Sequence, residues 1–99
     1  MYIVTRTDLS APQRAVQAIH AAIEAAKTFP LPEQHPNVVL LAVSNEDALN
    51  EAYFNALRAD IPVVPFHEPD LDNQLTAVAS APVYGVARKH FAGYQLLKG

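Results

Sequence analysis

The sequence contains no cysteine. This excludes disulfides, thiolate nucleophiles and cysteine-type metal sites, and it fits the reducing cytoplasm, where we expect the protein to reside. Glycine is almost as scarce, with three residues among 99, and their positions exclude the glycine-rich loops that cradle phosphates. No apolar run approaches the ~20 residues that a bilayer span needs, so we expect no membrane partner. The opening MYIVTRTDLS has no basic segment ahead of its apolar residues, so no signal peptide is predicted.

Positive charge is also limited. Seven lysines and arginines stand against ten aspartates and glutamates, which gives a formal net charge of −3. Such a domain has no overall field that attracts phosphate backbones, so any contact with nucleic acid needs a local basic patch. The candidate patches are Arg6 with Arg14, and the run from Arg88 to His90. The four histidines lack the H-x₃-H or similar spacing of a metal site, so no metal is predicted.

What the chain does have is apolar content, at 51% of its residues, enough for a single domain over residues 1–99. Its strand-like segments are 2–6, 37–43, 62–66 and 75–81. Helices are predicted from Ser10 to about Lys27, from Ser44 to about Asp60, and over 82–91. The closing YQLL is expected to be a tail or a short strand. The order β-α-β-α-β-β-α predicts an α/β fold: a mixed four-stranded sheet flanked by helices, with parallel pairing across the crossovers.

Each of the first two helices has a start signal. Ser10 and Gln13 have the spacing of a capping box, and Ser44 with Asp47 repeats that spacing. Further along the first helix, three large residues form an apolar stripe: Val16, Ile19 and Ile23. Beside the stripe runs a polar column, made of Gln13, Gln17, His20 and Glu24. This column is either a solvated edge or the wall of a site.

Two polar segments follow strands that we expect to be parallel. Asp8 follows the first strand, and the loop HEPDLDNQ (67–74) follows the third. Ligand sites in open α/β sheets form beyond the carboxyl ends of parallel strands, so these segments and the first turn of the first helix should converge. A carboxylate of Glu68 or Asp70 beside the imidazole of His20 would suit general acid–base catalysis. Thr76, just inside the fourth strand, could add a hydroxyl donor.

Each of these residues also has a structural explanation. Asp8 suits a turn, the acidic loop suits a solvated surface, and Thr76 is an ordinary strand former. A single histidine on a helix flank is commonly a structural residue. Only the predicted convergence of these residues favours a site.

Several motifs, in order along the chain, resemble the archaeal and eukaryotic class (class two) of peptidyl-tRNA hydrolases. That family opens with a strand ending in R-x-D-L, followed by a helix with Q-x-x-H-A. The corresponding residues here are Arg6, Asp8, Leu9, Gln17, His20 and Ala21. The segments NVVLLAVSNEDALNEAYFNALRADIPVVPF, LTAVASAP and FAGYQLLKG are similar to the family's later strands, helix and ending. By this resemblance the chain is identified as a short, divergent member, with a peptidyl-tRNA hydrolase class-two-like fold.

The resemblance implies cofactor-free hydrolysis of the ester bond of peptidyl-tRNA or a related acyl ester, with peptidyl-tRNA as the partner. By resemblance, the catalytic residues would include His20, Glu68 or Asp70, and Thr76. The substrate-binding candidates at the same edge are Asp8, Gln13, Arg14 and Gln17.

The chain departs from the family in two basic segments. The family's basic loop before Q-x-x-H is shortened here to SAPQR, and its loop after the third strand becomes HEPDLDNQL, without an arginine. Both changes remove phosphate-binding charge. The alternative function is therefore a non-catalytic binding module on the same fold. An apolar VYGVA segment or an edge strand would support a homodimer.

Overall fold

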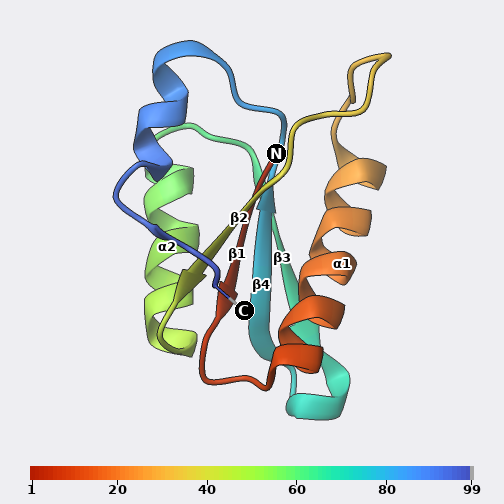
Figure 1. Ribbon diagram of the computed structural model, residues 1–99, viewed down its shortest axis with the longest axis vertical. Helices are drawn as coiled ribbons and strands as arrows, with labels where there is room; N and C mark the ends of the chain where they lie inside the picture. Colours follow the sequence, from red (N-terminus) through yellow and green to blue (C-terminus); the bar gives the residue numbers. More distant parts are fainter. Residues whose placement is uncertain (99) are drawn as a thin grey trace.

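A five-stranded mixed sheet lies between two α-helices in the computed structural model, which describes residues 1–98 (Figure 1). The α/β architecture with flanking helices is confirmed, but the sheet has five strands and not four. The closing residues supply the extra strand, because Gln95–Leu96 pairs with Val39–Val43. The elements in chain order are β1 (Tyr2–Arg6), α1 (Ala11–Thr28), β2 (Val39–Val43), α2 (Glu46–Arg58), β3 (Val63–Glu68), the 3₁₀ helix η1 (Pro69–Leu71), β4 (Gln74–Ser80), the 3₁₀ helix η2 (Gly85–Phe91) and β5 (Gln95–Leu96).

The strand order is β3-β4-β1-β2-β5. β1 is parallel to β2, whereas β4 is antiparallel to both β1 and β3. β1 and β3 therefore run in the same direction, as predicted, although β4 lies between them. From β1 the chain crosses through α1 to one side, and from β2 it crosses through α2 to the other. Right-handed crossovers in opposite directions place the two helices on opposite faces of the sheet (Figure 1).

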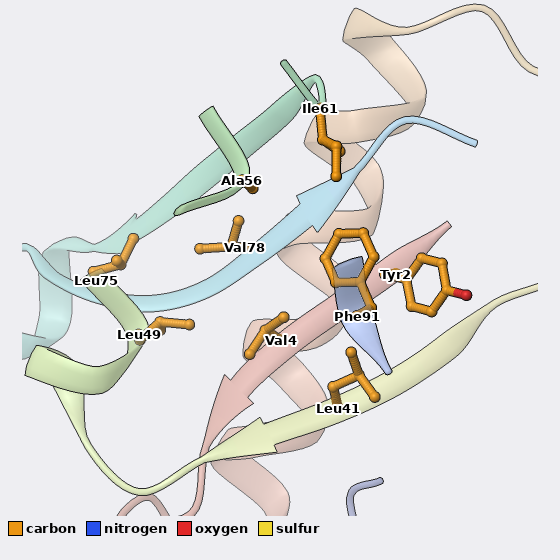
Figure 2. Close-up of a cluster of buried hydrophobic side chains, with 9 residues drawn as sticks. All are labelled: Tyr2, Val4, Leu41, Leu49, Ala56, Ile61, Leu75, Val78 and Phe91. Atoms are coloured by element: carbon orange, nitrogen blue, oxygen red, sulfur yellow. The ribbon is translucent and has the colours of Figure 1, made fainter. Parts of the chain in front are cut away.

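The core between α2 and the sheet is built from large apolar side chains. Tyr2 stacks on Phe91 of η2, with ring centroids 4.2 Å apart. Figure 2 shows side chains from α2 and η2 converging there with side chains from β1, β2 and β4. The buried members are Tyr2, Val4, Leu41, Leu49, Ala56, Ile61, Leu75, Val78 and Phe91.

The core under α1 is built from small residues instead. Ala18, Ala21 and Ala25 are buried and belong to the same cluster as Ile3 and Ala79 of the sheet. The apolar stripe predicted from Val16, Ile19 and Ile23 faces away from the sheet, with exposed fractions of 48%, 58% and 50%. Alanine lets a helix approach a sheet closely, so the small residues form the buried face and the larger ones lie outside.

The capping box at the start of α1 is confirmed, since Ser10 and Gln13 each bond the other's backbone N–H. The second predicted box, Ser44 with Asp47, is wrong. Asn45 is the N-cap of α2, and its Oδ1 accepts a 2.9 Å hydrogen bond from the backbone N–H of Ala48. The helix begins one residue later than predicted because the amide of Asn45 takes the capping role.

The predicted loop 67–74 is shorter in the structure. His67 and Glu68 extend β3, and Gln74 begins β4. Between them η1 is followed by two residues with left-handed backbone, Asp72 and Asn73, with φ of 54° and 58°. Aspartate and asparagine tolerate this conformation better than most residues, so the turn is tight.

The last predicted helix, 82–91, is a 3₁₀ helix over Gly85–Phe91. Gly85 starts it with a φ of 62°, a value that favours glycine. Within residues 1–98, no helix is both long enough and apolar enough to cross a membrane.

Candidate functional site

The edge of the sheet at the carboxyl ends of β1 and β3 contains an ion pair between buried Arg6 and exposed Asp8. The guanidinium of Arg6 donates to both carboxylate oxygens of Asp8, each at 2.9 Å. Its Nη1 also donates to Oε1 of Gln74 at 2.9 Å and to the carbonyl of Leu75 at 3.1 Å. Arg6 is only 6% exposed, so its hydrogen-bonding capacity is used inside the protein. Arg6, a candidate phosphate contact from the sequence, is therefore a structural residue here.

The same pair sets the acid–base behaviour of Asp8. The hydrogen bonds from Arg6, aided by its positive charge, hold the pKa of the Asp8 carboxyl below its ordinary value. Asp8, predicted as a substrate-binding residue, lies at this edge, but both of its oxygens are occupied by Arg6.

A chain of hydrogen bonds joins β4, α1 and β3 at this edge. The hydroxyl of Thr76, which is wholly buried, lies 2.7 Å from Oε1 of Gln17 and 3.3 Å from the carbonyl of Phe66. A hydroxyl has one proton, and the shorter contact to Gln17 is the better donor geometry. Nε2 of Gln17 then donates to Oε1 of Glu68 at 3.2 Å. Gln17 is 4% exposed, so the chain runs from the buried sheet to a half-buried carboxylate.

His20 lies on the next turn of α1 after Gln17. Its ring stacks on Phe66 of β3, with centroids 4.6 Å apart and planes 8° from parallel. Phe66 is two residues before Glu68, and both side chains contact the same helix. The imidazole and the carboxylate therefore lie on the α1 side of β3. Of the polar column on α1, Gln17 and His20 contact residues of β3.

The remaining predicted residues lie around this cluster. Asp70 is exposed in η1, immediately after β3. Gln13 is exposed and its side chain accepts from the backbone N–H of Ser10 at 3.0 Å. Arg14 is half-buried in the first turn of α1. Thr76, predicted as a catalytic hydroxyl, is buried, and its hydroxyl contacts Gln17 and the carbonyl of Phe66.

The sequence did not identify three residues of this edge. Phe66 supports the imidazole, Gln74 binds Arg6, and Oε2 of Glu46 accepts a 2.8 Å hydrogen bond from the backbone N–H of Leu75. All three act across elements that are distant in sequence. An alternating strand pattern places Phe66 and Glu68 on one face of β3, and this was the available signal for Phe66.

Nowhere in residues 1–98 do three histidine, aspartate or glutamate side chains gather in a way that could hold a metal ion.

No family model matches the chain, and the search of curated proteins finds no match. Among solved structures, the chain is similar to the protein of unknown function Atu0240 from Agrobacterium tumefaciens strain C58, with a TM-score of 0.60 at 14% identity. The match covers 98% of this chain and 96% of that one. This similarity supports the α/β fold alone, and membership of the peptidyl-tRNA hydrolase family stays a prediction.

Proposed function

We propose that this protein hydrolyses an acyl ester, peptidyl-tRNA or a related one, at the carboxyl edge of β1 and β3. The observation that carries the proposal is the hydrogen-bonded chain from Thr76 through Gln17 to Glu68, beside the stacked ring of His20. Such an arrangement holds a carboxylate and an imidazole on rigid elements, which general acid–base catalysis needs.

In this proposal His20 is the general base. Its imidazole takes a proton from a water molecule, and the water oxygen attacks the acyl carbon of the ester. The tetrahedral intermediate collapses, the bond to the ribose oxygen breaks, and the imidazolium returns the proton to that oxygen. Glu68 stabilises the imidazolium by its charge, and Asp70 is the second carboxylate at this edge. Gln17 and Thr76 are positioning residues, because both are buried.

Charge limits how the substrate is held. The guanidinium of Arg6 in β1 is bound to Asp8. Arg14, in the first turn of α1, is therefore the arginine at this edge that remains for contact with the substrate. Phosphate contacts dominate the affinity of proteins for nucleic acid. The substrate of this protein is therefore recognised mainly at its acyl end, with few phosphate contacts.

A non-catalytic binding module is the second candidate. The loss of basic residues from the segments SAPQR and HEPDLDNQL favours it, since phosphate contacts dominate the affinity of proteins for nucleic acid. The two candidates make opposite predictions for hydrolysis by the wild-type protein.

The test compares wild type with His20→Ala on peptidyl-tRNA and on an N-acetyl-aminoacyl ester of adenosine, which lacks the tRNA body. We expect the wild type to hydrolyse both esters, and H20A to be at least ~100-fold slower, the usual contribution of a general base. His67→Ala is the matched control, because His67 is an exposed histidine of β3, next to Glu68. Equal rates in wild type and H20A would remove His20 from the mechanism. A folded wild-type protein that hydrolyses neither ester would favour the binding module.

Salt dependence separates the two substrates. If phosphate contacts contribute, the KM for peptidyl-tRNA rises with salt while that for the adenosine ester stays constant. We expect a shallow slope, equivalent to about one or two phosphates.

A further inference from the structure

Two adjoining cavities lie at the opposite edge of the sheet, beside the amino end of β1 and the helix η2. Their volumes are about 310 and 470 Å³, and both are lined by Tyr2, Val39, Gly85 and Arg88. Tyr2, at these cavities, and Arg6, at the edge with the proposed site, are the two ends of β1, so they lie ~13 Å apart along the strand. Figure 1 shows η2 and the segment after α1 at the same end of the molecule, opposite η1.

The charge of the lining is unusual for an acidic chain. Among residues 1–98, no aspartate or glutamate lines either cavity, although ten occur in the sequence. The ionisable side chains that do line them include Arg88, Lys89 and His35. The amino group of Met1 adds to this set and donates to the carbonyl of Asn37 at 2.7 Å. Burial, and then the charge of Arg88, lower the pKa of that amino group, so like charges face one another here.

The orientation of Arg88 is set by an aromatic side chain. Its Nε lies 3.2 Å from the hydroxyl oxygen of Tyr2 and donates to it. The Tyr2 ring is itself fixed by stacking on Phe91, with planes 11° from parallel (Figure 2). Within residues 1–98, the terminal Nη1 and Nη2 atoms make no hydrogen bond or ion pair. The guanidinium therefore presents free donors in the planar geometry that matches carboxylate or phosphate oxygens.

We propose that these cavities form one binding site for a small organic anion, in which a terminal carboxylate or phosphate is bound by Arg88. The walls that would contact the rest of the ligand include the apolar and aromatic side chains of Val83, Tyr84 and Leu41, beside the polar side chains of Gln34 and Asn37. Tyr84 is 70% exposed at the first cavity, where its ring is available to cover a flat ligand. The first cavity is half-enclosed and the second is an open groove, so a bound ligand would stay partly exposed to solvent.

The test is an amide-shift titration of the full chain by ¹⁵N NMR, with benzoate, phenyl phosphate, benzamide and inorganic phosphate as probes. We expect saturable shifts at Tyr2, Gly85 and Arg88 with benzoate or phenyl phosphate. Benzamide has the shape of benzoate without the charge, and should bind about tenfold more weakly or worse. Comparing benzoate with phenyl phosphate shows which oxyanion is preferred, and inorganic phosphate shows whether the apolar group contributes.

Substitutions locate the site. Arg88→Gln should weaken benzoate binding by about tenfold or more, whereas Arg58→Gln, an exposed arginine outside both cavities, should leave it unchanged. Tyr2→Phe keeps the stacked ring but removes the acceptor of Arg88, and should weaken binding several-fold. Because Arg88 is exposed, R88Q should keep the wild-type spectrum outside this edge. Equal binding of benzoate and benzamide, equal affinities of R88Q and R58Q, or no saturable shift at this edge would each overturn the proposal.

Discussion

The hydroxyl of Thr76 in β4 donates a 2.7 Å hydrogen bond to Oε1 of Gln17 in α1, across 59 positions of sequence. The amide Nε2 of Gln17 in turn donates a hydrogen bond to Glu68 of β3. One amide side chain thus ties a helix to two strands at the proposed site. The geometry of the site and the stability of the fold depend on the same contact, which leads to the first prediction.

Thr76→Val should destabilise the protein by ~1 to 3 kcal/mol. Valine has the shape of threonine, so the change leaves packing intact but removes the donor to Gln17 inside the protein, and a buried polar group without a partner is costly. Urea unfolding at neutral pH gives the free energy of unfolding. Thr7→Val is the matched control, because Thr7 is exposed, and should change that energy by no more than ~0.5 kcal/mol. Equal effects of T76V and T7V would contradict the role of this hydrogen bond.

Asp8→Asn should flatten the loss of stability in acid. Arg6 lowers the pKa of Asp8 in the folded state, so ionisation of Asp8 favours folding. This contribution is complete above the ordinary pKa of an aspartate, about 4, and is lost as the pH falls through the lowered folded-state value. The carboxylate is 41% exposed, so the contribution is modest and is screened by salt.

Urea unfolding between pH 2 and 7 measures this difference. At low salt the wild type should lose more free energy of unfolding than D8N over the acid range, and the two curves should approach each other at high salt. Parallel curves at low salt would mean that Asp8 does not couple to folding.

Asn45→Ala should cost about 1 kcal/mol of stability, whereas Ser44→Ala should be close to neutral. The side chain of Asn45 caps α2 by accepting from the N–H of Ala48, and loss of an N-cap has this typical cost. Ser44 is exposed and precedes the cap. Thermal unfolding of the two variants measures which residue caps α2. A larger loss of stability in S44A than in N45A would favour the capping box predicted from the sequence.

Local patterns predicted much of the fold. The bounds of β1, the cap at Ser10 and the two helical crossovers follow from strand propensity, capping chemistry and the alternation of elements. For the closing YQLL the sequence leaves a tail or a short strand open, because β5 contains two residues and is defined by its pairing with β2.

The buried face of α1 shows where pattern reasoning fails. Large apolar residues define a stripe in the sequence, yet Ala18, Ala21 and Ala25 are the ones that pack inward. The distance between helix and sheet selects small residues for this face, and that distance is a tertiary property. The outer stripe, together with Tyr84 and Val86, which are 70% and 81% exposed, leaves the homodimer as a prediction.

Only part of the candidate site follows from local patterns. Parallel strands bring the carboxyl ends of β1 and β3 to one edge, where α1 begins, and the contacts of α1 with β3 then place His20 and Glu68 on the same side of β3. The commitment of Arg6 to Asp8 and the burial of Thr76 depend on contacts between distant segments. The cavities at Arg88 likewise combine segments from both ends of the chain and the loop after α1, which carry no shared motif.

The claim that His20 and Glu68 act as one catalytic unit is tested most directly by a double-mutant cycle on kcat/KM for the N-acetyl-aminoacyl adenosine ester. The variants are His20→Ala, Glu68→Gln and the double substitution, each with its fold checked by its circular dichroism spectrum. Residues that work as a unit give strongly non-additive losses. We predict that the double variant is no more than about threefold slower than H20A alone. Losses that multiply, or a wild type without hydrolytic activity, would contradict the account.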